Sequence, residues 1–137
     1  MTAIDEARRG YIDSARALTP KLLARAKDAE AARQIPEQTH LDFLESGLYR
    51  VFQPARYGGN EFELGMMIEL AGEIGRGCGS SAWIFSNLSV QNWMIGMTHP
   101  EAQEEVWGDN PKALTASSFP SPDARVRKVD GGILADG

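Results

Sequence analysis

The sequence predicts a mainly α-helical fold over residues 1–110, followed over residues 111–137 by the start of a β domain. Two observations favour this division. Apolar residues recur at steps of three or four through most of the first 110 residues, the period of a helix buried along one side. After Pro111 the pattern shortens, and Asp130-Gly131 separates two short apolar segments, which is typical of a β-hairpin.

The first third of the chain has the pattern of one or two helices that bury a single stripe. The stripe is formed by Ile4, Ala7, Tyr11, Ala15, Leu18, Leu22, Ala26 and Ala29. Pro20 fits either the first turn of a second helix or a kink in one long helix, and the sequence leaves both open. A shorter helix is expected from about Glu37 to Ser46, closed by Gly47, with Leu41, Leu44 and Leu48 as its apolar face.

Three more helices are expected before residue 110. Pro54 and the pair Gly58-Gly59 indicate a loop over residues 49–60. A helix with an apolar stripe should follow and end in the glycines at 75, 77 and 79. Its stripe is Leu64, Met67, Leu70 and Ile74. The next helix runs from Ser80 to about Met97, and the last is expected to begin with a capping box of Thr98 and Glu101 and to end at Gly108.

The helix from Ser80 to Met97 contains no Asp, Glu, Lys or Arg. A membrane span of this length is disfavoured, because its five Ser, Asn and Gln side chains between residues 86 and 92 would be costly in lipid. We therefore expect this helix to lie at the centre of a helical domain.

The last 27 residues are expected to form strands. The expected strands cover residues 113–118, 125–129 and 133–135. Two or three strands cannot bury one face of a sheet by themselves. The expectation is therefore that the chain is part of a larger protein and is inactive alone; a natural short product is the alternative.

Composition disfavours several classes of function. A net charge of −5 and a pI near 5.0 are unfavourable for binding nucleic acid or an anionic membrane. The single cysteine, Cys78, cannot form an intrachain disulfide, and the two histidines lack a ligand-spaced partner, so no metal site is expected. Neither of the common glycine-rich phosphate loops occurs. The start of the chain is charged and lacks an apolar segment, which favours a cytoplasmic location.

Two segments carry residues that could form a binding site. Trp83, Asn87 and Gln91 are spaced by four on the uncharged helix, so we expect them to share a face and to line a substrate pocket. The alternative is that both amides pair with backbone or neighbouring helices in the core, because a buried amide without a partner costs about 1–3 kcal/mol. The second segment, residues 115–120, combines hydroxyl groups with an extended backbone. It suits the edge of a flat heterocycle, although a plain surface turn is the alternative.

The order of the motifs resembles the N-terminal part of the two-component flavin-dependent aromatic monooxygenases, whose oxygenase components have the acyl-CoA dehydrogenase fold. The resemblance covers nearly the whole chain from about residue 20. It is carried by Ile35-Pro36, Gly47-Leu48-Tyr49-Arg50, Gln53-Pro54-Ala55-Arg56-Tyr57-Gly58-Gly59, Gly77-Cys78-Gly79-Ser80-Ser81-Ala82-Trp83, Glu105-Val106-Trp107-Gly108 and Ser117-Ser118-Phe119-Pro120. In that fold, residues 1–110 would form the N-terminal helical domain and residues 111–137 the first strands of the middle β domain.

The resemblance also implies an activity. A separate flavin reductase would supply reduced FAD or FMN, and the oxygenase would use it with O2 to hydroxylate a small phenolic substrate. By position, Ser117, Ser118 and Phe119 match the segment that holds the flavin, and Trp83, Phe85 and Phe119 would form walls of the site. Gln91 falls where several relatives carry a histidine, which leaves the substrate and any acid or base undetermined. The full-length protein would be a homotetramer.

Two other functions are compatible with the sequence. An acyl-CoA dehydrogenase has the same fold but usually carries Thr-Glu-Pro at the flavin segment, where this chain has Ser118-Phe119-Pro120. Its catalytic glutamate would lie beyond residue 137. A non-catalytic helical interaction module is the third possibility, and it would never bind flavin.

Overall fold

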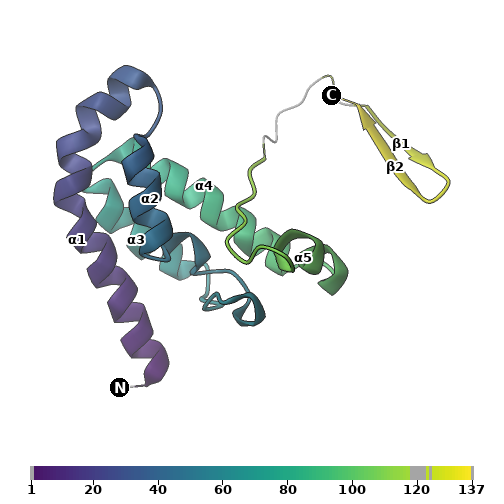
Figure 1. The fold of residues 1–137 in the computed structure, drawn as a ribbon, viewed down its shortest axis with the longest axis horizontal. Helices are drawn as coiled ribbons and strands as arrows, with labels where there is room; N and C mark the ends of the chain where they lie inside the picture. Colours follow the sequence, from purple (N-terminus) through teal and green to yellow (C-terminus); the bar gives the residue numbers. More distant parts are fainter. Residues whose placement is uncertain (1, 118–122, 124, 137) are drawn as a thin grey trace.

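The computed structural model describes residues 2–117, 123 and 125–136. It confirms a mainly helical fold with a short C-terminal β-hairpin (Figure 1). The helices within the described residues are α1 (Ala3–Ala32), α2 (Glu37–Glu45), α3 (Gly65–Gly75), α4 (Gly79–Gly96) and α5 (Pro100–Trp107). Two short 3₁₀ helices, η1 (Leu48–Arg50) and η2 (Ala55–Tyr57), occupy the expected loop, and the strands are β1 (Arg125–Val129) and β2 (Gly132–Asp136).

Helix α1 is continuous, with Pro20 inside it, so the alternative of one long helix is the correct one. Its N-terminus is closed by a capping box, in which the Thr2 side chain accepts from the Asp5 N–H and the Asp5 carboxylate accepts from the Thr2 N–H. Beside the proline, the Thr19 hydroxyl lies 3.1 Å from the Glu73 carbonyl oxygen of α3. This contact ties α1 to its neighbour where the proline weakens the helix.

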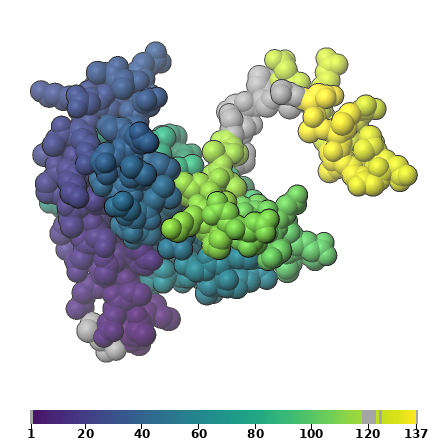
Figure 2. Space-filling view, viewed as in Figure 1, coloured from purple at the N-terminus to yellow at the C-terminus, as the bar shows by residue number. Residues whose placement is uncertain are grey.

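The turn between α3 and α4 lies directly against α1. A Cβ atom at Gly77 would lie 2.5 Å from the Thr19 carbonyl oxygen and 2.8 Å from the Leu22 Cβ, so only glycine fits without displacing α1. Ion pairs join the outer edges of α1 and α3: Arg16 pairs with Glu73 at 2.9 Å, and Arg8 pairs with Glu69. The space-filling view shows α1 packed along the helical part of the molecule (Figure 2).

The core is built from apolar side chains of α1 to α4 and from aromatic rings around η1. Phe43 of α2 contacts the rings of Tyr49 and Phe85 edge to face, with centroids 5.5 and 6.1 Å apart. The buried Asn92 amide of α4 donates to the Tyr49 carbonyl oxygen at 2.7 Å. This hydrogen bond connects η1 to the C-terminal half of the uncharged helix.

Three local expectations are wrong in detail. Leu41 is 38% exposed, because α2 turns Asp42 and Phe43 inward instead. Thr98 does not cap α5: its hydroxyl donates to the Ile95 carbonyl oxygen, and the His99 side chain accepts from the first turn. Residues 113–117 form no strand, since no strand lies beside them in the described residues, and residue 118 lies outside these.

The hairpin forms where the Asp-Gly pair predicts it. Strands β1 and β2 are antiparallel, and Val129 faces Gly132 across the turn. Gly131 takes a φ of 79°, a conformation that favours glycine. Every strand residue is exposed. Among the described residues, no helix has both the length and the hydropathy that a membrane span requires.

The close approach at Gly77 generates a stability prediction. Gly77→Ala should lower the free energy of unfolding by about 1–3 kcal/mol, because the new methyl group must displace the α1 backbone. Gly72→Ala is the matched control: it lies inside α3 with open space around it, and should raise the free energy of unfolding by about 0.5–1 kcal/mol. Urea unfolding measures both changes. Equal effects of the two substitutions would contradict the packing at Gly77.

The buried carboxylate of Asp42 generates a prediction about pH. Burial opposes its ionisation, but hydrogen bonds from Arg25, at 2.7 Å, and from Gln38 outweigh burial and lower the pKa below the ordinary 3.8. Its stabilising effect is therefore present above pH 3.8 and is lost as the pH falls through the lowered pKa. Asp42→Asn should cost about 1.5–3 kcal/mol at pH 7 and should reduce the loss of stability below pH 3.8.

Thermal unfolding between pH 2 and 7 checks this prediction. The exposed Asp109 supplies the control substitution, Asp109→Asn, which should leave the stability at pH 7 unchanged. An Asp42→Asn variant with the full acid dependence of the parent would show that another carboxylate is responsible.

Candidate functional site

Helix α4 carries the three residues expected to line a pocket, but it exposes them unequally. Trp83 is 70% exposed and Asn87 is exposed, whereas Gln91 is only 8% exposed. Residues four apart on an α-helix are displaced by about 40° around the axis, so Trp83 and Gln91 differ by about 80°. The expected face therefore turns from the surface at Trp83 into the protein at Gln91.

The Gln91 side chain contacts the segment expected to hold the flavin. Its Nε2 donates to Ser117 Oγ at 2.8 Å. Ser117 is exposed, and its hydroxyl retains its own hydrogen to donate to a further acceptor. The structure thus brings together one residue from each of the two predicted groups. Ser118 and Phe119, the other expected flavin residues, lie outside the described residues.

Three contacts hold the segment that leads to Ser117. The Gln53 amide donates to the Pro111 carbonyl oxygen at 2.8 Å, and the Trp107 indole N–H lies 3.3 Å from the Ala113 carbonyl oxygen. Leu114 packs against the core. These contacts hold residues 111–114 against Gln53, α5 and the core, and the hydrogen bond from Gln91 then brings Ser117 to α4, although the segment is not a strand.

Trp83 and Asn87 lie apart from this contact. The Asn87 amide donates to the Trp83 carbonyl oxygen of its own helix at 2.9 Å. Both residues border a shallow hollow of about 190 Å³, smaller than the usual range for a ligand pocket, about 300–1,000 Å³. Phe85, expected as a wall of the site, is instead fully buried in the core.

The buried polar groups beside Gln91 were not predicted from the sequence. Asn92 is fully buried, and its signal in the sequence is the spacing of Phe85, Ser89 and Asn92, which places an amide on the core side of α4. Within the described residues, four buried polar atoms have no hydrogen-bond partner: Gln53 Oε1, Ser89 Oγ, Asn92 Oδ1 and Thr115 Oγ1. All four belong to α4 or to segments that contact it, so this region has unused capacity for polar contacts.

Groups that could titrate or bind a metal are scarce at this site. Helix α4 contributes no charged side chain. Burial raises the pKa of Tyr49, which keeps its hydroxyl protonated, and this hydroxyl lies 3.3 Å from His40 Nδ1. In the part of the chain that the structure describes, no three His, Cys, Asp or Glu side chains are grouped to hold a metal ion. Helix α4 thus offers neutral hydrogen-bonding groups at Gln91 and, on a separate part of its surface, the exposed indole of Trp83.

Comparison with known proteins identifies relatives of this chain. Residues 5–109 match the family described as the N-terminal domain of acyl-CoA dehydrogenase. The chain is 33% identical over 121 residues to the oxygenase subunit HsaA of a flavin-dependent monooxygenase from Rhodococcus jostii, covering 88% of this chain and 31% of the relative. It is 35% identical over 120 residues to the oxygenase component of p-hydroxyphenylacetate 3-hydroxylase from Acinetobacter baumannii, covering 88% of this chain and 28% of the relative.

Solved structures agree with this relationship. The crystal structure of the HsaA monooxygenase from M. tuberculosis matches with a TM-score of 0.89 and 30% identity, over 95% of this chain and 35% of that one. XiaF from Streptomyces sp., in complex with FADH2 and glycerol, matches with a TM-score of 0.87 and 25% identity, over 98% of this chain and 34% of that one. The chain spans about a third of the length of the curated relatives it matches. It belongs to the acyl-CoA dehydrogenase N-terminal domain family and is homologous to the N-terminal part of the oxygenase components of flavin-dependent aromatic hydroxylases.

Proposed function

We propose that the protein acts in the oxygenase component of a two-component monooxygenase that hydroxylates a small phenolic substrate with reduced flavin and O2. The observation that carries the proposal is the hydrogen bond from Gln91 to Ser117, because it joins the expected substrate residue to the expected flavin segment. The names of the relatives support the reaction class, since they include hydroxylases of p-hydroxyphenylacetate and of resorcinol. Both compounds are phenols.

The same names support the choice of cofactor and partner. The resorcinol hydroxylase from Rhizobium is described as FADH2-dependent, and XiaF was solved with FADH2, which favours FAD over FMN here. The hydroxylases of p-hydroxyphenylacetate and of resorcinol are both named as oxygenase components, which supports a separate reductase that supplies the reduced flavin. Bound reduced flavin would supply the electrons needed to activate O2.

The described residues fit a flavin at this place. Ser117 is exposed, and its Oγ already accepts from Gln91, so the hydroxyl is oriented and its hydrogen can be donated outward. Residues 113–117 belong to no helix or strand, which leaves backbone groups that no ladder uses open to a ring edge. In this proposal Ser117, Ser118 and Phe119 hold the flavin, and Gln91 orients Ser117.

On the substrate side, the proposal gives Trp83, Asn87 and Gln91 different tasks. Gln91 donates to Ser117, and in this proposal it contributes to the binding of both the flavin and the substrate. Trp83 presents an exposed indole, and Asn87 lies between the two on the helix. An aromatic ring and neutral amides can position a phenol without requiring a charge on it.

The proposal has three further parts. The helical domain ends near residue 110, which is supported by the end of the family match at residue 109. The full-length protein assembles as a homotetramer, and it works in the cytoplasm, where a reductase can supply reduced flavin. The exposed hairpin supports assembly with further strands, since two strands alone bury no sheet face.

The activity itself is the first test. The protein, produced at the length of its relatives, is mixed with a flavin reductase, NADH, FAD and a panel of monohydric and dihydric phenols. The expected result is a product with one added hydroxyl group, formed only when both components are present. Flavin binding without hydroxylation of any phenol would contradict the reaction class, and absence of flavin binding would favour a non-catalytic helical module.

The contact between Gln91 and Ser117 supports a second prediction. Ser117→Ala should weaken the binding of reduced FAD by about 1 kcal/mol, or roughly fivefold, because one hydrogen bond is lost. Gln91→Leu should have a similar effect by releasing the serine. The double variant should bind FAD little more weakly than either single one, since both changes remove the same interaction.

Anaerobic fluorescence titration measures these affinities. Ser14→Ala is the control, because the Ser14 hydroxyl donates to the Gly10 carbonyl oxygen on the surface of α1. Fully additive losses in the double variant would show that the two residues act separately. A sharp drop in melting temperature with unchanged FAD affinity would instead assign Gln91 to the core.

A further inference from the structure

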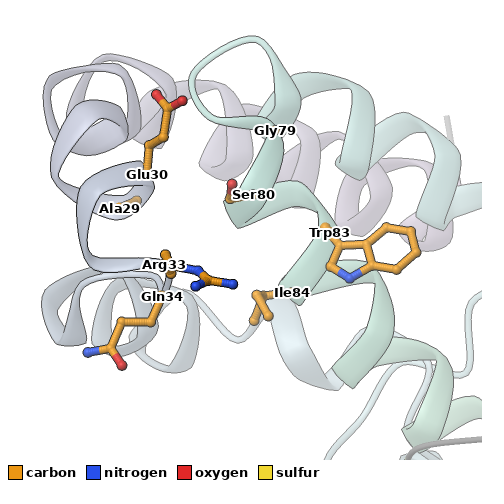
Figure 3. Close-up of a pocket in the computed structure, with 8 residues that line it drawn as sticks. All are labelled: Ala29, Glu30, Arg33, Gln34, Gly79, Ser80, Trp83 and Ile84. Carbon is orange, nitrogen blue, oxygen red and sulfur yellow. The ribbon is translucent and has the colours of Figure 1, made fainter.

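A hollow lies between the C-terminal end of α1 and the first two turns of α4 (Figure 3). Its volume is about 520 Å³, within the usual range for small-ligand sites, about 300–1,000 Å³. Trp83 borders this hollow and also belongs to the proposed oxygenase site. Eight residues separate Trp83 from Gln91, which is about 12 Å along the helix. The hollow therefore lies apart from the contact between Gln91 and Ser117, although it shares Trp83 with the proposed substrate residues.

The positive charge of Arg33 lies at one end of this hollow. Arg33 ends α1 in the left-handed conformation, with φ at 55°, and its N–H donates to the carbonyl oxygens of Ala29 and Glu30. Its guanidinium extends from α1 toward α4 (Figure 3). Within the described residues, no carboxylate oxygen lies within 4.0 Å of this guanidinium. Glu30 also borders the hollow, but its carboxylate points away from Arg33 in this view.

Besides Arg33 and Glu30, the lining of the hollow combines apolar and aromatic groups with the neutral polar side chains of Gln34 and Ser80. Ala29 and Ile84 line it, and Ile84 lies between the Arg33 guanidinium and the Trp83 indole in Figure 3. The indole is 70% exposed, which is unusual for so large an apolar surface. Helix α4 cannot neutralise Arg33, because it carries no charged side chain.

We propose that this hollow binds a small aromatic carboxylate. Its carboxylate pairs with the Arg33 guanidinium, which matches the geometry of carboxylate oxygens, and its ring lies on Ile84 toward the near edge of Trp83. An amine would be repelled by Arg33, and a neutral ring would leave the guanidinium without a partner. An inorganic anion would make no use of the apolar lining. The proposal needs no flavin, so it stands or falls independently of the proposed oxygenase activity.

Titration of the 137-residue protein with sodium benzoate tests the proposal. The indole N–H resonances of its three tryptophans are followed by nuclear magnetic resonance and assigned with Trp83→Phe. The expected result is a saturable shift of the Trp83 resonance with a dissociation constant of about 1 mM, typical of a one-ring ligand. Benzamide has the same shape without the charge, and it should bind at least about fivefold more weakly. Equal binding of the two compounds, or a shift without saturation, would overturn the proposal.

Two arginine substitutions identify the site. Arg33→Gln should weaken benzoate binding at least about fivefold and leave benzamide binding unchanged, whereas Arg33→Lys should keep part of the affinity. Arg76→Gln is the matched control, since Arg76 is another exposed arginine and lies outside this hollow. Unchanged benzoate affinity in Arg33→Gln, or the same loss in Arg76→Gln, would show that the hollow is not the binding site. Circular dichroism confirms that each variant is folded.

Discussion

The contact between Gly77 and α1 is the constraint on which the rest of the structure depends. The turn between α3 and α4 touches the α1 backbone beside Pro20, where a side chain of any size would be in the way. This contact determines where α4 begins relative to α1. The position of α4 in turn places Asn92 under η1 and Gln91 under Ser117. A glycine without any chemical role thus positions the residues that we assign to binding.

Most of the fold could be predicted from the sequence because helix periodicity and the Asp-Gly turn are local signals. Pro20 could not be interpreted locally, since the continuity of α1 depends on the contact of Thr19 with α3. The start of α5 was placed one residue early, because Thr98 has a capping side chain but bonds back to α4 instead. The strand expected over residues 113–118 requires a neighbouring strand, and a propensity for strand cannot supply one.

The candidate site was only partly predictable, for a similar reason. Gln91 and Ser117 were each identified from their own surroundings, but they are 26 residues apart, and their contact depends on how Gln53 and Trp107 hold the segment between them. The side chains of Trp83, Asn87 and Gln91, spaced by four, were expected to share one face of the helix and to be exposed to the same degree. The helix instead turns it from exposed Trp83 to buried Gln91, because the helical period is shorter than four residues.

Because α4 carries no charged side chain, dissolved salt affects its polar contacts differently from the ion pairs between α1 and α3. The edges of α1 and α3 are joined by exposed arginine–glutamate pairs, which dissolved ions screen at physiological ionic strength. Gln91 and Asn92 hold their neighbours through neutral hydrogen bonds, which such screening barely weakens. A rise in ionic strength therefore loosens the outer edge of α1 while the surroundings of Ser117 stay as they are. The contact that holds Ser117 therefore keeps its strength when the ionic composition of the surroundings changes.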